Sequence, residues 1–476
     1  MGAATASDRA TTPSFRPDTS NPFAHIAADL RIERAADAPL PPGELRFSIA
    51  RTLRFNEDPL PALLEAYERF GPVFTLRLLH APVVFMLGPA ANHHITVAHA
   101  DNFLWRDGSL GDLIALLGDG LLTTDGTAHK RARRILLPAF HRERIAASAG
   151  TMLDEAERAV AQWSDGEDVE AYLWARRLAL RVATRALFGL DPDDVGDVDL
   201  AAEFEDALAL YGRNYFAQSL RGPGSPWRRL QVARRRLDRV LFTEIARRRR
   251  RREEREDILS LLLAATDEGG WQLTDQQVRD QAMTLLFAGH DTTTSTVAFL
   301  LYELARNPDE LPPLLDELDG LGGRRPTAAE LMSGLPRLEM AMDEALRMYP
   351  PAWIGPRRAI DAFAFEGQAV PAGARVNYCS WASHHLAEVF ADPFAFRPAR
   401  FAPDAKAKLP KGAYVPFGGG SRTCIGMRFG QLEIKAIAAT LLRRCTLDLQ
   451  PDFRLRIREM PTLSPRDGLP MRVRSR

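Results

Sequence analysis

Near its C-terminus the chain reads Phe417-Gly418-Gly419-Gly420-Ser421-Arg422-Thr423-Cys424-Ile425-Gly426, and a run with helical apolar spacing follows from Met427 to Leu442. Consecutive glycines let the backbone turn tightly and take positive φ values. The pattern therefore places Cys424 where a tight turn meets the start of a helix. Unpaired amides and the helix dipole favour a thiolate there, and Arg422 adds positive charge, so we expect a lowered pKa for the Cys424 thiol. A thiolate is either a nucleophile or a metal ligand.

The surrounding sequence argues against most uses of this cysteine. No histidine lies nearby in sequence to activate a nucleophile, and Thr423 stands where G-x-S-x-G and G-x-G-x-x-G both need glycine. A zinc or iron–sulfur site is poorly supported, because Cys379 and Cys445 form no C-x-x-C pair with it or with each other. A single thiolate suits a metal that another group already holds. A buried structural cysteine is the plain alternative.

The pattern F-x-x-G-x-R-x-C-x-G is matched in full, and the stretch resembles the haem-binding loop of the cytochrome P-450 monooxygenases. The resemblance implies that Cys424 is the axial thiolate ligand of haem iron, a ligand that favours cleavage of the O–O bond. It also implies that Phe417, Gly418 and Arg422 contact the cofactor, haem b.

A second informative stretch is a long predicted helix. Thr274 and Gln277 form a capping-box signature, and the helical pattern continues from Asp275 to Asn307-Pro308. A helix of this length spans roughly 50 Å, enough to cross a domain. Its middle is apolar almost all round, which predicts a buried central helix.

Polar residues interrupt that apolar helix at Ala288-Gly289-His290-Asp291-Thr292. Glycine and threonine weaken the helical hydrogen-bond ladder, so the pattern alone indicates a polar kink. The segment also resembles the P-450 motif [A/G]-G-x-[D/E]-T. The resemblance implies that Gly289 makes room for dioxygen, that Thr292 holds dioxygen and a water molecule, and that Asp291 relays protons. His290 occupies the variable position and receives no role.

Basic residues at two further places are candidates for holding the cofactor. His129 and Arg133 share one helix face, which predicts either an anion site or a solvated basic helix. The resemblance implies that they bind the haem propionates and that Arg357, or alternatively Arg358, is a third propionate ligand. In the resembling family, a basic surface such as that of Lys130, Arg131 and Arg134 docks an acidic electron donor.

Glu344 and Arg347 match the family's E-x-x-R motif, and their spacing places both side chains on one helical face. The resemblance implies a buried ion pair completed by Arg400 from a later loop. The chain departs from the family's usual P-E-R-F there, because Ala399 replaces the glutamate. We expect a structural role for this triad and no part in the chemistry.

Composition narrows the class of protein and its location. The 476 residues are 46% hydrophobic with a formal net charge of zero, so no global charge favours nucleic acid or an anionic membrane. The arginine run 247–252, followed by Glu253, Glu254 and Glu256, is typical of a solvated helix end. With three unpaired cysteines, no signal-peptide pattern and no apolar run of about 18 residues, we expect a cytoplasmic protein without a membrane anchor.

Two segments are predicted: an N-terminal arm over residues 1–45, partly mobile, and a haem-thiolate monooxygenase domain over residues 46–476. The expected fold is mainly α with small β-sheets, the cytochrome P-450 fold in a single large domain. The helical pattern at 62–70 and the hairpin pattern at 73–86 belong to this domain.

The resemblance implies insertion of one oxygen atom from O₂ into a lipophilic small molecule, with electrons from a ferredoxin or flavodoxin and its reductase. The rival hypotheses are a peroxide-driven peroxygenase, an O₂-independent haem isomerase or dehydratase, and a non-enzymatic haem sensor or carrier. Apolar residues near the motifs are the candidates for the substrate pocket. They are Phe103, Leu104, Trp105, Leu286, Phe287, Trp353, Ile354 and Leu463.

Overall fold

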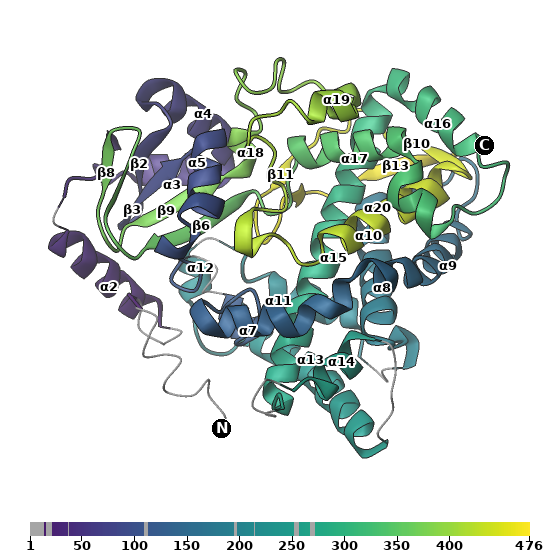
Figure 1. The fold of residues 1–476 in the computed structure, drawn as a ribbon, viewed down its shortest axis with the longest axis horizontal. Coiled ribbons are helices and arrows are strands. Elements are labelled where there is room, and N and C mark those ends of the chain that lie inside the picture. Colours follow the sequence, from purple (N-terminus) through teal and green to yellow (C-terminus); the bar gives the residue numbers. More distant parts are fainter. Residues whose placement is uncertain are drawn as a thin grey trace.

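The long central helix is α15 (Asp275–Arg306), and the other helices gather around it (Figure 1). Thr274 caps the helix, and both hydrogen bonds of the predicted capping box with Gln277 are present. Almost every side chain from Val278 to Leu304 is buried, as the all-round apolar pattern predicted. The structure is a computed structural model that describes residues 14–15, 21–36, 38–108, 113–194, 198–213, 215–251, 257–266 and 272–476.

The long helices that pack directly on α15 are α10 (Ala171–Val182), α13 (Pro226–Arg251), α17 (Pro336–Met348) and α20 (Met427–Leu442). In the next layer, α9 (Ala149–Val160) packs on α20 and α11 (Leu200–Leu208) packs on α13. The remaining helices are α2 (Pro22–Ala35), α3 (Ile49–Glu57), α4 (Pro59–Phe70), α5 (Pro89–His93), α6 (Ile114–Leu117), α7 (Gly126–Leu136), α8 (Arg142–Ala147), α12 (Tyr215–Ser219), α14 (Ile258–Ala264), α16 (Leu311–Asp319), α18 (Ser380–Ser383) and α19 (Pro403–Lys406).

A six-stranded sheet forms the β-rich end in the order β1 (Gly43–Glu44), β2 (Val73–Leu78), β3 (Ala81–Met86), β9 (Arg375–Cys379), β6 (Ile354–Ala359), β4 (Phe103–Leu104). The predicted hairpin is confirmed, because β2 and β3 pair antiparallel. Smaller sheets join β10 (Cys445–Leu449), β13 (Pro470–Ser475) and β5 (Asp168–Glu170); β11 (Ile457–Arg458) and β12 (Ser464–Pro465); and β7 (Phe363–Phe365) and β8 (Gln368–Val370). The expected class, mainly α with small sheets, is confirmed.

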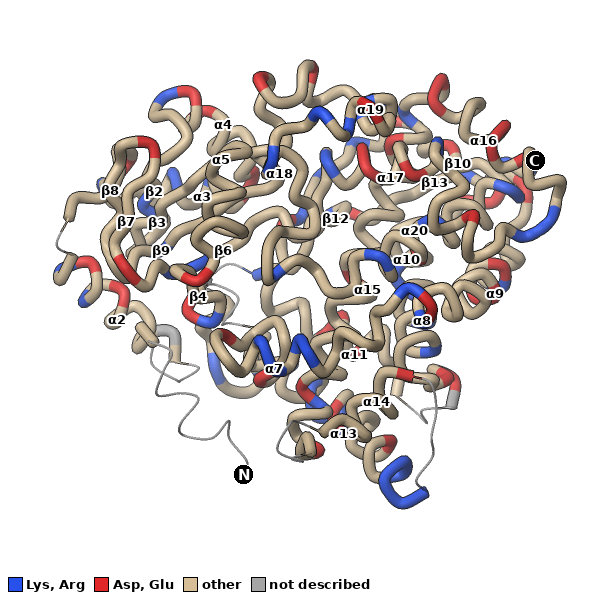
Figure 2. The backbone as a smooth tube through the Cα atoms, in the orientation of Figure 1, with Lys and Arg blue, Asp and Glu red and all other residues tan. Residues whose placement is uncertain are grey.

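The end of α13 is solvated in part, as expected: its arginines gather at the lower tip of the molecule (Figure 2), and Arg250 and Arg251 are exposed. Arg248, however, is buried, with Nη1 at 2.5 Å from Asp257 Oδ1 and Nη2 donating to the Phe188 carbonyl at 2.6 Å. Arg248 therefore anchors α13 on its inner face. The carboxylates expected to neutralise it, Glu253, Glu254 and Glu256, lie outside the described residues.

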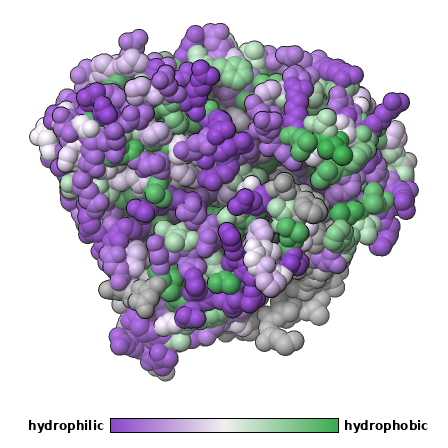
Figure 3. Space-filling view, turned by 180° about the vertical axis from the view of Figure 1, so that it is seen from behind, coloured by the Kyte–Doolittle hydropathy of each residue, from purple (hydrophilic) through white to green (hydrophobic). Residues whose placement is uncertain are grey.

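Seen from behind, the surface is mostly hydrophilic, and hydrophobic side chains gather near one edge (Figure 3). Large apolar side chains with high exposure follow one another around the start of α3, namely Leu45, Phe47, Ile49 and Leu53. Within the described part of the chain, no helix combines the length and the apolar character needed to cross a membrane.

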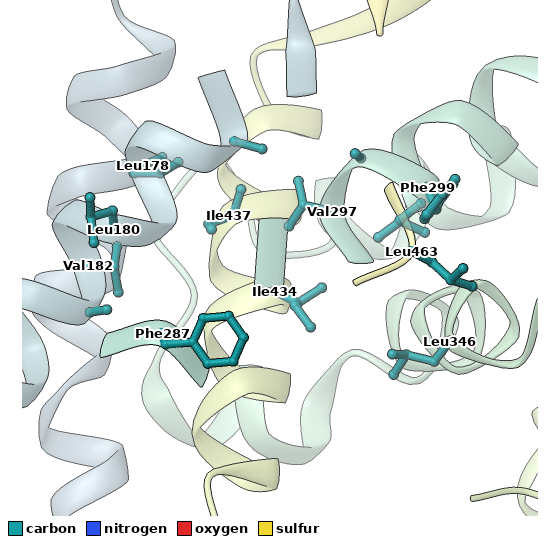
Figure 4. Packing of buried hydrophobic residues seen from close by; sticks show 14 of the residues in the cluster. Leu178, Leu180, Val182, Phe287, Val297, Phe299, Leu346, Ile434, Ile437 and Leu463 are labelled. Atoms are coloured by element: carbon teal, nitrogen blue, oxygen red, sulfur yellow. The ribbon is translucent and has the colours of Figure 1, made fainter. Parts of the chain in front are cut away.

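The main hydrophobic core lies where α10, α15, α17 and α20 meet. Phe287 of α15 points toward Ile434 of α20, and Leu463 lies near Leu346 of α17 (Figure 4). A second, smaller core sits on the β-rich end, where Phe103 packs among Val84, Met86 and Val376. The contacts along α15 therefore join helices that are far apart in the sequence.

The N-terminal segment belongs to the fold earlier than the predicted boundary at residue 45. Strand β1 pairs with β2, and the buried Asp29 of α2 forms an ion pair with Arg358 of β6 at 2.6 Å. Burial alone would raise the pKa of Asp29, but the hydrogen bond with His80 and the charges of Arg375 and Arg358 hold it well below its ordinary value. Within the predicted arm of residues 1–45, residues 1–13, 16–20 and 37 lie outside the described residues, and its partial mobility stays a prediction.

Asp29→Asn should destabilise the protein by about 3 kcal/mol at pH 7, because it leaves the buried Arg358 without its counter-charge. A lowered folded-state pKa gives stability that is present above the ordinary value of 3.8 and is lost as the pH falls toward the folded-state pKa. The difference between wild type and variant should therefore narrow below about pH 4. Urea unfolding across pH measures this.

Asp168→Asn is the matched control, because Asp168 also has arginine as a partner but lies at the surface. This variant should change stability little at any pH. An Asp29→Asn protein as stable as wild type at pH 7 would contradict the role given to the buried pair.

Candidate active site

The Cys424 loop is held by its own backbone. Gly418 and Gly420 take φ values of +69° and +60°, and the Cys424 amide donates to the Phe417 carbonyl at 2.9 Å. A Cβ at Gly420 would lie 2.2 Å from the Thr96 carbonyl oxygen, so glycine is required for this close approach. The loop ends at Gly426, the N-cap of α20, whose bounds agree with the predicted helix.

Cys424 is accessible to solvent, although protein surrounds it on most sides. Its side chain is exposed to solvent, and yet burial raises the pKa of its thiol, against the effects of the Gly426 amide and the charge of Arg133. The Cys424 thiol can thus be reached from solvent although protein atoms surround most of it. The expected lowering of the pKa is wrong for the protein alone, and Arg133, not Arg422, is the cation that acts on the thiol. A metal ion bound there would hold the group as a thiolate.

One short face of α15 is open, although the rest of the helix is buried. Ala288 is exposed and Thr292 is partly exposed, whereas Phe287 and Thr293 on either side are buried. Residues four apart lie on one face of a helix, so these two side chains share an opening. Thr292 Oγ1 donates to the Ala288 carbonyl at 2.7 Å.

Gly289, which the resemblance predicted to make room for dioxygen, is partly exposed and lies beside the exposed Ala288. A Cβ on Gly289 would lie 3.7 Å from side-chain atoms of both Ala183 and Leu187, in the π-helical turn that continues α10. This is an ordinary van der Waals distance, so packing on that turn does not require glycine here. The role expected of Gly289 stays a prediction.

The carboxylate of Asp291 is buried beside two residues that no motif indicated. Thr462 Oγ1 donates to Asp291 Oδ2 at 2.6 Å, and Arg176 Nη2 lies 4.0 Å from Asp291 Oδ1. Thr462 comes from the C-terminal hairpin and Arg176 from α10, so only the folded chain brings them to α15. His290 is also buried, and burial lowers its pKa.

The candidate cofactor-binding cations converge on Asp125, just before α7. Arg422 Nη2 donates to Asp125 Oδ1 at 2.6 Å and to the Thr124 carbonyl at 2.8 Å. Burial lowers the pKa of Arg422 to about 10, which the charge of Asp125 opposes and the charges of Arg357 and Arg133 reinforce. Burial, with the charges of Arg422 and Arg133, lowers the pKa of His129 to about 3.

This cluster carries more positive than negative charge in a poorly solvated place. Among the described residues, the charges acting on Arg422 are those of Arg357 and Arg133 and one carboxylate, Asp125. Buried charge is costly unless it is paired, so the cluster suits an anionic ligand. Arg358 is not available to it, because its guanidinium bonds to Asp29 at 2.6 Å and to the Gly373 carbonyl at 2.9 Å.

Two aromatic pocket candidates lie elsewhere. Trp105 lies beneath Arg357, with the guanidinium carbon 3.6 Å from the ring centroid, so it supports the cation cluster. Phe103 packs edge-on against Phe363 and near His94 in the second core. Leu104 is buried in β4.

The other pocket candidates divide between the core and the site. Leu286, Phe287 and Leu463 are buried in the main core. Trp353 is buried too, and its indole donates to the Glu459 carbonyl at 2.8 Å. Ile354 is partly exposed, and Ala352, which the sequence did not single out, is exposed in the same segment.

The E-x-x-R pair is fully buried in α17. Arg347 bonds to both carboxylate oxygens of Glu344, at 2.7 and 2.9 Å, and to the His384 carbonyl at 2.9 Å. Arg400 Nε adds a bond to Glu344 Oε1 at 3.2 Å, and the Arg397 amide adds another at 2.9 Å. Ala399 therefore does not prevent the third member from reaching the pair.

Comparisons with known proteins agree with this geometry. The sequence model of the cytochrome P450 family matches residues 39–467. The solved structure of retinoic acid-bound cyanobacterial CYP120A1 superposes with a TM-score of 0.83 and 30% identity, covering 92% of this chain and 99% of that one. Cyclooctat-9-en-7-ol 5-monooxygenase of Streptomyces melanosporofaciens is 35% identical, covering 70% of this chain and 73% of that one. Taxane 10-beta-hydroxylase of Taxus cuspidata is 28% identical, covering 85% of this chain and 83% of that one.

The fold and the cysteine loop thus define a haem-thiolate oxidoreductase. The chain belongs to the cytochrome P450 family, and it is a P450 monooxygenase.

Arg347→Met should cost about 3–5 kcal/mol in unfolding free energy, because it strands the fully buried Glu344 carboxylate. Arg400→Met should cost about 1–2 kcal/mol, because Arg400 is partly exposed and contributes one bond among several. Guanidinium unfolding of the two variants measures the difference. If both variants lost the same unfolding free energy, the larger stabilising role given to Arg347 would be contradicted.

Proposed function

We propose that this chain binds haem b through Cys424 and uses it to insert one oxygen atom from O₂ into a lipophilic small molecule. The observation that carries the proposal is the pairing of two openings in an otherwise buried centre. One is the accessible thiol before α20, and the other is the open face of α15 at Ala288 and Thr292. Helices α15 and α20 pack on each other, and Thr293, next to Thr292, donates to Glu433 of α20 at 3.1 Å. This contact brings together the two segments that carry the openings.

The buried cation cluster supports haem as the bound group. Haem carries two propionate carboxylates, and His129, Arg133, Arg357 and Arg422 bring positive charge together with too few carboxylates of their own. We assign Arg357, not Arg358, to a propionate. Cys424 would hold the iron, and Phe417 and Gly418 would line its side of the group.

When bound, the haem supplies the iron that activates O₂, and the protein supplies the protons. Thr292 presents a hydroxyl on the open face of α15, and Asp291 is the neighbouring buried acid. A hydroxyl coupled to a carboxyl group can deliver protons without admitting bulk water. This pair supports the monooxygenase over a peroxygenase, which has less need of a relay.

Several features support a lipophilic substrate. Ala288 on the open face of α15 is apolar, and so are the accessible residues Ala352 and Ile354 in the segment after α17. Retinoic acid, cyclooctat-9-en-7-ol and a taxane, the molecules named for the three relatives, are all rich in hydrocarbon. We propose a molecule of comparable character.

We further propose that the electrons come from a separate acidic partner, a ferredoxin or flavodoxin with its reductase. Lys130 and Arg134 are exposed on α7, and Arg131 is partly exposed. The tube of α7 carries segments coloured for Lys and Arg (Figure 2). On the same helix, Arg133 acts on the Cys424 thiol. The basic surface of α7 therefore lies close to the proposed iron ligand, where electrons must arrive.

The purified protein, reduced and exposed to carbon monoxide, should show the strongly red-shifted Soret band of haem with a cysteinate ligand. Cys424→His should abolish that shift, because imidazole replaces the thiolate. Cys445→Ala, which removes a buried cysteine of β10, should leave the band in place. An unshifted band in the wild type would overturn the assignment of Cys424.

Thr292→Ala should lower product formed per electron consumed by about tenfold and release peroxide, because the relay hydroxyl is lost. Thr294→Val is the matched control, since its hydroxyl makes the same type of bond, to the His290 carbonyl at 2.7 Å, but is fully buried. Coupling is measured as product and peroxide per NAD(P)H. Full coupling in the Thr292 variant would disprove the relay.

A further inference from the structure

The C-terminal hairpin around β11 and β12 touches the proposed relay acid directly. Among the described residues, the Thr462 hydroxyl is the one side-chain donor within hydrogen-bond distance of Asp291, at 2.6 Å. Both side chains are at least 95% buried. The bond therefore forms away from bulk water, where a hydrogen bond to a charged group is strong.

The other charged and titratable groups around Asp291 do not fix its orientation. Arg176 of α10 lies 4.0 Å away, beyond hydrogen-bond distance, and balances charge without setting direction. His290 on α15 bonds to its own helix at the Leu286 carbonyl, 2.8 Å away. In the described part of the chain, Arg176 Nε and His290 Nε2 have no hydrogen-bond partner. Burial raises the pKa of Tyr172 of α10, and the charge of Asp291 raises it further.

The hairpin that carries Thr462 is itself fixed on several sides. Arg458 donates to the Tyr172 hydroxyl and to the Ser464 hydroxyl, each at 3.2 Å. The Leu463 amide donates to the Pro351 carbonyl at 3.1 Å, next to the exposed Ala352. The hydroxyl of Thr462 is thus presented to α15 by a segment anchored on α10 and on the stretch after α17.

We propose that Thr462 is a positioning residue that holds the Asp291 carboxylate in the orientation from which it serves Thr292. This inference rests on the proposed function, and it adds a second element, the C-terminal hairpin, to a relay otherwise contained in α15. Thr462 touches neither substrate nor haem in this role. It acts through Asp291 alone.

The test compares Thr462→Val, which keeps the shape and removes the hydroxyl, with Thr462→Ser, which keeps the hydroxyl. Infrared difference spectra of the resting holoprotein report the carboxylate stretch of Asp291, assigned by its loss in Asp291→Asn. Thr462→Val should shift that band, and Thr462→Ser should leave it in place. Thr75→Val, at a buried threonine of β2 whose hydroxyl has no partner among the described residues, controls for the substitution itself.

Turnover provides the second readout. Thr462→Val should lower product per electron by about tenfold with an unchanged substrate dissociation constant, the size expected for loss of one hydrogen bond to a charged group. Thr462→Ser should restore coupling to within about twofold. An unshifted band in Thr462→Val overturns the proposal, as does full coupling in Thr462→Val when Asp291→Asn is uncoupled. Full coupling in Asp291→Asn instead overturns the relay in the proposed function, while the infrared band still decides whether Thr462 holds the carboxylate.

Discussion

The burial of α15 on all sides is the constraint on which the rest of the structure depends. A helix of 32 residues that is apolar all round must be surrounded, and α10, α13, α17 and α20 do this. Polar groups in such a helix then need partners from its neighbours. Thr293 donates to Glu433 of α20 at 3.1 Å, and Asp291 accepts from Thr462. The polar residues of α15 are therefore satisfied both by a helix that buries it, α20, and by the C-terminal hairpin.

Periodicity and capping chemistry sufficed to predict the main elements. The bounds of α15 and α20 agree with the sequence, because capping residues and apolar spacing are local signals. The hairpin of β2 and β3 was equally local. The docked helix α2 escaped prediction, because its weakly amphipathic sequence gives no sign that Asp29 will meet Arg358 from the far end of the chain. An ion pair between distant residues adds no periodic pattern to the sequence.

The sequence predicted those site residues that belong to a motif. It did not predict the residues that only the packing of the folded chain brings to the site. Cys424, Asp291 and Thr292 came from motifs, whereas Arg176 and Thr462 became apparent only from their distances to Asp291. Apolar character alone could not separate pocket from core, so Phe103 and Trp353 were expected in the pocket although they are buried in packed regions. The expected lowering of the Cys424 thiol pKa is wrong for the protein alone, because burial raises this pKa by more than the Gly426 amide and the charge of Arg133 lower it.

Strand β6 places two consecutive arginines on opposite faces of the sheet, as the alternation of a strand requires. Arg357 faces the cation cluster over Trp105, and Arg358 faces Asp29 of α2. A shift of one residue in the pairing of β6 with β9 would exchange the two guanidinium groups. The register of this one strand thus decides which arginine anchors the N-terminal helix α2 and which one joins the cation cluster.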